Sequence, residues 1–463
     1  MKRTYGITFA VLALGGMASA MLQSLVAPAL RDIQLDLHTS TTNASWILTA
    51  FLLSASVATP ICGRLGDMFG KKRLLVIALA SLAAGTLISA LAGALALMLA
   101  GRVVQGLGAG VIPLAIGIIR DEFPPERVAS RIALISATLG FGGGLGIVLA
   151  GPIVDHLSYH WLFWLPLGPF AVAALGVLLF VPESPVRTPG RVDWAGAVLL
   201  AGWLVTLLLA ISEASSWGWS SARIIALFIA AAVLALVWVV VETRNRTPLV
   251  DMRMMRLRGV WTTNATGMLL GAGMFAAFVL IPQLVQLPTS TGYGFGASVT
   301  QAGLFLLPSA VAMLLLSVVA GRLDSTVGSR IPLVLGAAVS SGAFALLALA
   351  HSGRFEIYLS TALLGVGIGL AFAAMANLIV EAVPSEQTGV ATGMNTIMRT
   401  IGGSIGSTVS AVIVSSSVAA SGLPREHGFT LAFAVSAIAL AVAALAALYV
   451  PARTTAALRK EGT

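Results

Sequence analysis

Long apolar runs recur along the chain and limit the folds that it can adopt. Each run is about 20 residues long, which is the length that an α-helix needs to cross a hydrocarbon core of about 30 Å. The runs are continuous rather than alternating, which argues against strands, and a helix satisfies its own backbone groups in lipid. We therefore predict an all-α polytopic membrane protein with 14 spans, at 6–29, 44–62, 74–93, 96–119, 132–154, 161–181, 195–213, 222–241, 260–282, 298–320, 331–350, 356–379, 389–415 and 428–450.

The composition agrees with a chain that lies mostly in lipid. Hydrophobic residues make up 58% of the sequence and charged residues only 10%, whereas a soluble domain carries about 25% charged residues. The net charge of +9 does not indicate nucleic-acid binding, because the bases are not interleaved with stacking aromatic residues on one surface. The single cysteine, Cys62, excludes internal disulfides and thiolate metal sites. We expect no metal and no cofactor, since His156 and His160 lack a third ligand nearby.

The N-terminal run could be either a signal peptide or a retained span. Lys2 and Arg3 precede it, and Ala18-Ser19-Ala20 resembles a signal-peptidase site. The apolar run nevertheless continues to Leu30, which is too long for a signal-peptide core. We interpret it as the first membrane span, with cleavage as the alternative.

The distribution of basic residues sets the orientation. If the N-terminus is cytoplasmic, 21 of the 27 lysines and arginines fall in inner segments and 4 in outer segments. Such a bias indicates which loops face the cytoplasm. We therefore expect both termini in the cytoplasm and a multi-pass protein of the cell membrane.

A charged, glycine-rich link joins the second and third predicted spans. It covers residues 63–73 and carries one acid, Asp67, followed by three consecutive bases. The bases must lie in headgroups and water, and the glycines let two helix ends approach closely, so we expect a tight turn. The pattern G-x-L-x-D-x-x-G-K-K-R resembles the signature loop of the major facilitator superfamily, with Met68 where the family commonly has arginine. An ordinary positive-inside turn is the alternative. The resemblance implies a cytoplasmic gate formed by Gly63, Asp67, Gly70, Lys71, Lys72 and Arg73.

Glycine patterns repeat at an offset of nearly 260 residues. Gly63, Leu65 and Gly70 recur as Gly321, Leu323 and Gly328; Gly106, Gly108 and Gly110 recur as Gly365, Gly367 and Gly369; Gly143-Gly144 recurs as Gly402-Gly403. A shared offset indicates two related six-helix halves. We predict one bundle at 1–183, a two-helix insertion with its linkers at 184–258 and a second bundle at 259–463. This plan resembles the fourteen-span drug:proton antiporter branch of the superfamily.

The fourth span carries an arginine within the membrane. An arginine near a helix centre costs about 2.5–3.5 kcal/mol on insertion scales, so Arg102 should face a cavity or a partner. The stretch Arg102–Gly110 is similar to the family motif R-x-x-Q-G-x-G, whose arginine is linked to proton transfer. A purely structural hydrogen-bond donor is the alternative. Arg399 in span 13 lies nearer the inner end, where snorkelling to the headgroups is the alternative.

The fifth span is glycine-rich between residues 140 and 151. It resembles the antiporter signature of the family, although Ile147 stands where a proline is usual and Ala150 replaces a glycine. Plain small-residue packing between helices is the alternative. The positions that match the signature are Gly142, Gly146 and Gly151.

Acids are missing from the middle of every predicted span. Members of the fourteen-span branch usually carry an aspartate in span 1, nine residues before a proline; if Pro28 is that proline, the position is Ser19. Acids that could carry a proton lie only at span ends, and we single out Asp155, Glu213 and Glu381. Polar candidates for a central cavity, with helix–helix contacts as the alternative role, are Ser19, Gln23, Gln105, Asn264, Gln283, Asn377 and Asn395.

These features lead to a functional hypothesis. We expect a proton-coupled exporter of small amphiphilic molecules that works by alternating access, as a monomer and without a cofactor. Two embedded arginines without an acid would repel cations, which favours neutral or weakly acidic substrates. The alternatives are a symporter that imports a metabolite and a membrane sensor without transport. A membrane enzyme is disfavoured, since the spans hold no HExxH motif and no paired acids.

Overall fold

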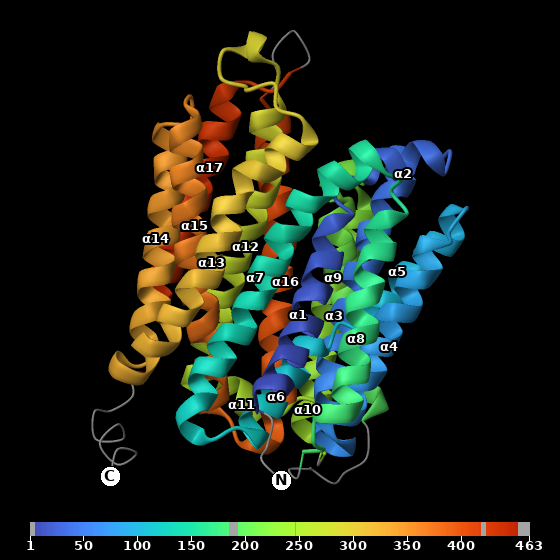
Figure 1. Cartoon of the computed structure of the whole chain (residues 1–463), viewed down its shortest axis with the longest axis vertical. Helices are drawn as coiled ribbons and strands as arrows, with labels where there is room; N and C mark the ends of the chain where they lie inside the picture. The colour runs from blue at the N-terminus through green and yellow to red at the C-terminus, as the bar shows by residue number, and fades with distance from the viewer. Residues whose placement is uncertain (1–4, 185–192, 246, 418–422, 452–463) are drawn as a thin grey trace.

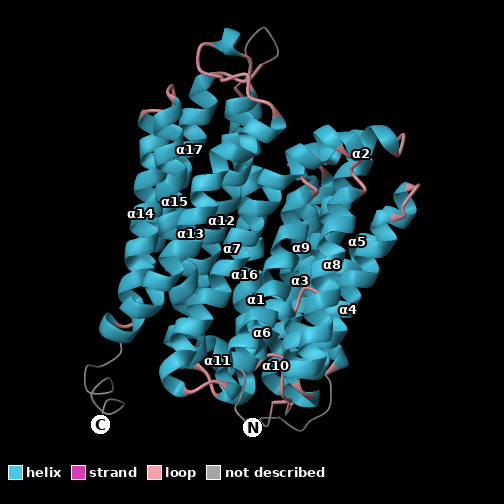
Figure 2. Ribbon diagram, viewed as in Figure 1, coloured by secondary structure: helices cyan, strands magenta, loops and turns pink. Residues whose placement is uncertain are grey.

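We describe a computed structural model of the chain, which covers residues 5–184, 193–245, 247–417 and 423–451. Every element of regular structure in those ranges is a helix (Figure 2). Fourteen helical segments are long and apolar enough to cross a membrane. The predicted fold class and the number of spans are therefore confirmed.

The helices follow the predicted order closely. The spanning elements are α1 (Tyr5–Leu25), α3 (Thr41–Phe69), α4 (Lys71–Ala90), α5 (Leu95–Leu107) with α6 (Val111–Glu122), α7 (Pro125–His156), α8 (Trp161–Phe180), α9 (Trp194–Trp217), α10 (Ala222–Arg244), α12 (Arg258–Gln286), α13 (Val299–Val327), α14 (Arg330–Leu349), α15 (Arg354–Ala382), α16 (Thr388–Ser415) and α17 (Glu426–Ala447). Shorter elements are α2 (Leu30–Asp36), α11 (Met252–Arg256) and two 3₁₀ turns, at Thr289–Thr291 and Ser385–Gln387.

The ends of several spans carry the residues that helix termini require. Ser40, Ser221 and Asp193 accept a hydrogen bond from a backbone N–H in the first turn of α3, α10 and α9. Ser298 forms a full capping box with Gln301 at the start of α13. These caps satisfy donors that would otherwise lack a partner.

The link between the second and third spans is shorter than expected. We predicted a turn over residues 63–73, but α3 continues to Phe69 and α4 begins at Lys71. Only Gly70 lies outside both helices, with φ +109°. That backbone conformation is open to glycine and strained for other residues, so one glycine reverses the chain. Asp67 is consequently helical and points from the end of α3.

The fourth span is divided, whereas the sequence predicted one helix over 96–119. α5 ends at Leu107 and α6 begins at Val111. Pro113 lies in the first turn of α6, where a missing N–H is tolerated, but it has no donor for the carbonyl of Ala109 four residues earlier. The helix therefore breaks at residues 108–110.

Two ends of the bundle can be distinguished. We call the end at which α1 begins with Tyr5 the proximal end, and the opposite end the distal end (Figure 1). The turns between α3 and α4 and between α15 and α16 lie at the proximal end. α17 also finishes there, with the carbonyl of Tyr449 accepting a hydrogen bond of 3.0 Å from Arg258.

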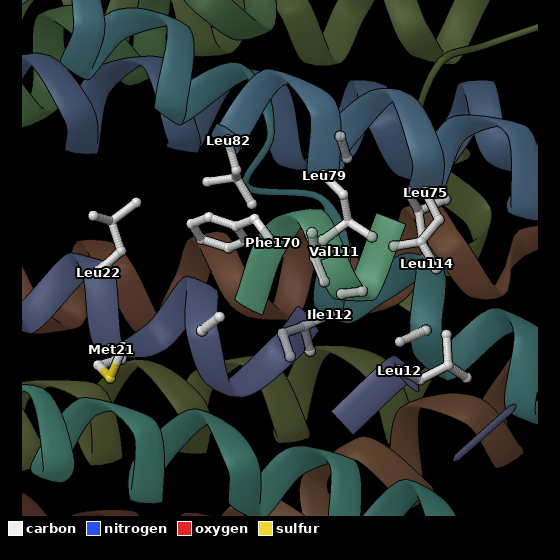
Figure 3. Packing of buried hydrophobic residues seen from close by; sticks show 14 of the residues in the cluster. Leu12, Met21, Leu22, Leu75, Leu79, Leu82, Val111, Ile112, Leu114 and Phe170 are labelled. Carbon is white, nitrogen blue, oxygen red and sulfur yellow. The ribbon is translucent and has the colours of Figure 1, made fainter. Parts of the chain in front are cut away.

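Buried apolar side chains form three main clusters. The first joins α1, α4, α6 and α8, with Leu12, Leu79, Leu114 and Phe170 fully buried (Figure 3). The second joins the helices from α12 to α17, apart from most of α16. The third packs α9, including Leu204, onto α16 and the start of α12. Apolar residues of all sizes, from alanine to phenylalanine and tryptophan, thus fill the space between helices.

Candidate functional site

A large cavity lies between the two halves of the chain and extends from the centre of the bundle to the distal end. Its volume is about 560 Å³. It reaches Pro28 beyond α1, Gln286 at the end of α12 and Val299 at the start of α13, all of which are distal. A cavity of this size can hold a drug-sized molecule.

Arg102 borders this cavity and is held by α3 directly and by α4 through Gln105. Its Nε donates to the carbonyl of Ile47 on α3 at 3.0 Å, and its Nη1 donates to Oε1 of Gln105 at 2.6 Å. The Gln105 amide in turn donates to Ser89 on α4 at 3.2 Å. The guanidinium also lies 4.5 Å from the ring centroid of Phe51. Because these contacts fix the side chain, Arg102 presents its charge at the cavity wall without rearrangement.

Arg399 borders the cavity from the other half. Its Nη2 donates to Oγ1 of Thr396 at 3.1 Å, and its guanidinium lies 4.7 Å from the ring centroid of Phe372. Arg399 is 8% exposed, so it does not snorkel to a headgroup region. Each half therefore contributes one arginine stacked on a phenylalanine.

The rest of the cavity wall is uncharged and mostly apolar, and it includes four phenylalanines. Among the described residues that line it there is no carboxylate. The polar members include Gln23, Gln283 and Gln286, and the ring of Phe278 adds apolar surface. On the proximal side of the cavity, a chamber of about 70 Å³ is lined by Ser19, Gln23 and Arg399, among other residues. The site combines positive charge, amide donors and aromatic surface, which suits an amphiphile that is neutral or anionic.

The structure does not bring every predicted polar residue to the cavity. Gln105 is buried behind Arg102 and acts on that side chain. Asn395 donates to Asn264 at 2.9 Å, which joins α16 to α12 below the cavity. Asn377 lies at the proximal end, where its amide donates to Asp324 at 2.8 Å and to the carbonyl of Ala129 at 3.2 Å.

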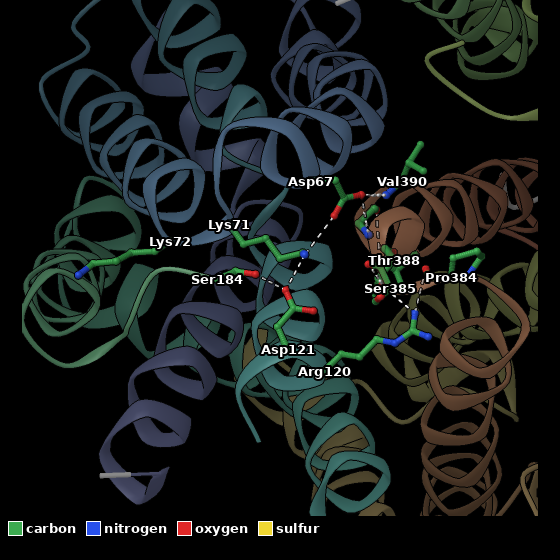
Figure 4. A network of polar contacts seen from close by, with 12 residues as sticks. Asp67, Lys71, Lys72, Arg120, Asp121, Ser184, Pro384, Ser385, Thr388 and Val390 are labelled. Carbon is green, nitrogen blue, oxygen red and sulfur yellow. Dashed lines mark hydrogen bonds and ion pairs between the residues drawn. The ribbon is translucent and has the colours of Figure 1, made fainter. Parts of the chain in front are cut away.

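At the proximal end, Asp67 docks on the first turn of α16 (Figure 4). Its Oδ2 accepts from the backbone N–H of Gly389 at 3.1 Å and of Val390 at 3.4 Å. The backbones approach so closely that a Cβ on Gly63 would lie 2.4 Å from the carbonyl oxygen of Gly389. Asp67 thus satisfies free donors at the positive end of a helix dipole in the other half.

Arg120, which the sequence analysis did not select, makes the complementary contact (Figure 4). It donates to the carbonyls of Val383 at 2.8 Å and Pro384 at 3.2 Å, just after α15, and to Oγ1 of Thr388 at 2.5 Å. A cation at the carbonyl end of a helix is stabilised by the helix dipole. The signal available in the sequence was a base beside an acid, Asp121, at the end of the fourth span. We call the contacts of Asp67 and Arg120 with residues 383–390 the proximal closure.

Lys71 ties the two acids of the first half together. Its Nζ lies 2.6 Å from Asp121 Oδ2 and 3.4 Å from Asp67 Oδ1, and Ser184 also donates to Asp121. Lys72 instead reaches the carbonyl of Leu178 at 3.0 Å. Its backbone N–H bonds Glu183, and Arg73 is exposed. Of the three bases in the motif, Lys71 alone contacts Asp67 in the part of the chain that the structure describes.

The glycines of the fifth span lie where α7 meets two other helices. A Cβ on Gly142 would lie 2.5 Å from the carbonyl oxygen of Met17 on α1, and one on Gly146 would lie 2.6 Å from that of Met21. A Cβ on Gly151 would lie 2.6 Å from Cα of Thr300 on α13. These three positions therefore permit close helix packing.

The three acids at span ends occupy different surroundings. Asp155 is exposed at the distal end and accepts from Thr300 Oγ1 at 2.7 Å. Glu213 is buried near the distal end of α9 and accepts from Ser216 at 2.7 Å. Glu381 is exposed at the proximal end, 3.5 Å from Ser329 Oγ. These acids lie away from the cavity wall.

Comparisons with known proteins agree with this architecture. The sequence profile of the Major Facilitator Superfamily matches residues 12–407 and, in a second match, residues 265–463. The chain is 31% identical to the "Tetracenomycin C resistance and export protein" of Streptomyces glaucescens, over 83% of this chain and 71% of that protein. It is 28% identical to "Multidrug resistance protein 3" of Bacillus subtilis, over 78% of this chain and 70% of that protein.

A solved structure shows the same fold. The human organic anion transporter MFSD10 (TETRAN) superposes with a TM-score of 0.66 and 15% sequence identity. The superposition covers 96% of this chain and 99% of the human one. At that identity the likeness concerns the arrangement of helices.

Proposed function

The chain belongs to the Major Facilitator Superfamily, and on that premise we propose that it is a proton-coupled exporter of small amphiphilic molecules. It is a multi-pass transporter of the cell membrane rather than an enzyme. The names of its relatives, which concern multidrug resistance and antibiotic export, support the export direction. We take the proximal end as cytoplasmic because the basic loops of the sequence gather there, and we expect the monomer to be the working unit.

The composition of the cavity carries the substrate assignment. Arg102 and Arg399 border one space with aromatic rings and amides, and the described residues of its wall include no acid. A cation in this low-dielectric space would face two positive charges and lose its hydration. Neutral or weakly acidic compounds are therefore the favoured substrates.

The conformation supports alternating access. The cavity reaches the distal end, whereas the proximal closure joins the two halves on the other side. This is the outward-facing arrangement of a transporter whose halves rock about a central site. One proton that moves down about 100 mV and one pH unit supplies about 3.7 kcal/mol, enough for a gradient of several hundred-fold. Since the described cavity wall holds no acid, the coupled proton would use Asp155, Glu213, Glu381 or the substrate itself.

Transport into everted membrane vesicles tests this function. Vesicles that contain the protein should accumulate fluorescein, an aromatic weak acid, and an uncoupler should abolish the accumulation. Propidium, a permanent dication, should not accumulate. Uncoupler-sensitive uptake of propidium would falsify the charge argument, and proton-driven loss of fluorescein from the vesicles would favour the symporter alternative.

The same assay tests the role of Arg102. Arg102→Ala should abolish fluorescein transport with a near-normal protein level in the membrane, and Arg102→Lys should also fail because lysine lacks the planar donor fork. Arg127→Ala removes the same charge from an exposed position outside the gate and serves as the matched control. Loss of the folded protein in Arg102→Ala, or equal transport by all three variants, contradicts the assignment.

A further inference from the structure

The fourth span is interrupted between the cavity and the proximal closure. α5 carries Arg102 at the cavity, and α6 carries Arg120 at the closure. Residues 108–110 separate the two pieces. Any change in the angle between α5 and α6 would therefore move the closure relative to the cavity.

The backbone at this break bonds differently from a regular helix. The N–H groups of Gly108 and Ala109 donate three residues back, to Gln105 and Gly106, at 3.0 Å each. Pro113 has no N–H that could donate to the carbonyl of Ala109. Carbonyls on the N-terminal side of the break are consequently turned toward neighbouring helices.

Side chains of α3 and α4 donate to these carbonyls. Ser54 on α3 donates to the carbonyl of Val103 at 2.7 Å, and Ser81 on α4 donates to that of Val104 at 3.0 Å. The thiol of Cys62 on α3 lies 3.6 Å from the carbonyl oxygen of Leu107. A broken helix at membrane depth is tolerated when neighbouring side chains bond its backbone groups, and here the acceptors lie in the last turn of α5, beside the break.

The glycines of the break let α3 and α4 approach closely enough to make these bonds. A Cβ on Gly106 would lie 2.5 Å from Cβ of Ser54, and one on Gly108 would lie 2.4 Å from the carbonyl oxygen of Ala78. A Cβ on Gly110 would lie 2.4 Å from Cβ of Cys62. A larger residue at any of the three positions would push the donor helices away.

The corresponding span of the second half shows that glycines alone do not cause the break. α15 carries the same glycine triplet at 365, 367 and 369, yet it runs unbroken from Arg354 to Ala382. Phe372 stands at the position of Pro113, and Ala320 stands at that of Cys62. Ser340 corresponds to Ser81 but donates within its own helix, to Gly336, at 2.8 Å. The second half thus lacks both the proline and the donors.

We propose that the break at residues 108–110 is a hinge of the transport cycle, and that Ser54, Ser81 and Cys62 are positioning residues that hold it bent in the outward-facing state. α5 stays with α3 and α4 through Arg102. α6 rotates about its buried Lys71–Asp121 ion pair and withdraws Arg120 from the end of α15. Straightening and bending of span 4 would then couple the cavity to the proximal closure. The hinge concerns the motion of span 4 and does not depend on which substrate is transported.

Restoring a helical donor at Pro113 is the first test. Pro113→Ala supplies an N–H for the carbonyl of Ala109, so the straight helix gains stability. In proteoliposomes we expect the maximal rate of fluorescein transport to fall about tenfold, as for about 1.4 kcal/mol, with an unchanged KM and a raised melting temperature. Pro169→Ala in the continuous helix α8 is the matched control and should leave the rate unchanged. A normal rate in Pro113→Ala, or a slow rate with a lowered melting temperature, would overturn the hinge.

The serine donors Ser54 and Ser81 are tested in the same transport assay, alone and in combination with Pro113→Ala. Ser54→Ala and Ser81→Ala should each lower the maximal rate about twofold to tenfold, the range for loss of one hydrogen bond, and Ser81→Thr should restore it. Adding Ser81→Ala to Pro113→Ala should cause no further loss, because the straightened helix no longer presents the carbonyl. Independent, additive losses in the double variant would show that Ser81 acts elsewhere.

Thiol labelling tests the hinge without any substrate. In a Cys62→Ser background, Gln283→Cys places a single thiol in the distal part of the cavity. Labelling from outside by a membrane-impermeant maleimide should slow when Pro113→Ala is added, because the bent outward-facing state is depopulated. Equal labelling rates would overturn the hinge. Failure of the wild type to transport fluorescein would instead contradict the proposed substrate class and leave this comparison valid.

Discussion

Two seams join the halves of this transporter, and they are built differently. At the α3–α16 seam the helices touch near the proximal end, through Asp67 and the Gly63–Gly389 contact, and then diverge around the cavity. The α7–α13 seam continues along the whole helix length. A Cβ on Gly321 would lie 3.0 Å from Cα of Ser130 near one end, and one on Gly151 would lie 2.6 Å from Cα of Thr300 near the other.

The two seams also differ in the polar contacts that cross between the halves. Asp67 bonds the backbone of the opposite half directly. Asp324, which lies in the repeated motif of the second half, accepts from Ser329 and Asn377 of its own half. Across this seam, Asn377 donates to the carbonyl of Ala129, and Thr300 donates to the exposed Asp155. The first seam therefore depends on a few charge–dipole bonds that can break together, whereas the second depends on continuous packing.

Helix α9, which the sequence analysis assigned to an insertion, lies against the first seam. Its apolar face, which includes Leu200 and Leu204, packs onto Met394 and Ile397 of α16 and onto Leu53 of α3. The seam that opens is thus covered by an additional helix on its outer side. We infer that the α7–α13 seam, which we call the spine, stays packed during transport, and that the α3–α16 seam is the contact that opens.

Filling the Gly63–Gly389 contact should have the largest effect. Gly63→Val places a side chain where the backbone of α16 lies, and overpacking costs about 1–3 kcal/mol. We expect fluorescein transport to be nearly lost while the protein still elutes as a folded monomer on size exclusion. At the spine, Gly144→Val would meet Cβ of Ala310 and should lower the melting temperature instead. If Gly63→Val and Gly144→Val had the same effect, the two seams would not differ in the way that we infer.

Removing the charge of Asp67 should have the next largest effect. Asp67→Asn keeps the shape but weakens the bonds to the start of α16, a loss of about 1–2 kcal/mol. We expect the maximal transport rate to fall about tenfold with little change in KM. Asp324→Asn, the counterpart in the second half, should be milder. A large change in KM with an unchanged maximal rate would contradict a gating role for Asp67.

Replacing the fork of Arg120 tests the other half of the closure. Arg120→Lys keeps the charge but cannot reach all three acceptors of Arg120 in the same geometry. We expect the maximal rate to fall about threefold, as for a loss of about 0.7 kcal/mol. Arg127→Lys, at an exposed position seven residues later, is the control and should behave as wild type. Equal rates in the two variants would show that the closure does not need the fork.

The distal contact of the spine should matter least. Thr300→Val removes the bond to Asp155, which is exposed to water. Changes at such sites stay within about 0.5 kcal/mol, so we expect a normal melting temperature and normal uncoupler-sensitive transport. A clear loss of proton coupling would instead assign Asp155 a part in proton transfer.

Much of the fold could be predicted because each span must satisfy its own backbone in lipid. Length and hydropathy therefore located the 14 spans, with ends that differ from those of the helices by up to seven residues. The position of Arg102 could likewise be predicted from the residues around it, because a charge within a span must face a cavity or a partner. The break at Pro113 was also within reach of the sequence, because a proline directly after three spaced glycines is a local signal that the helix will not continue.

Contacts between the halves could not be predicted in that way. The sequence marks Asp67 as part of a charged link and Arg120 as a base at a span end, and both descriptions also suit an ordinary loop. Apart from Oγ1 of Thr388, their partners are backbone groups at residues 383–390, about 260–320 positions away. A backbone N–H or carbonyl carries no residue-specific signal. The sequence by itself determined the spans and the embedded arginines, and it predicted two related halves. The tertiary structure decided which helix ends meet, because the dipole of a helix acts only on the charge that the fold brings to its end.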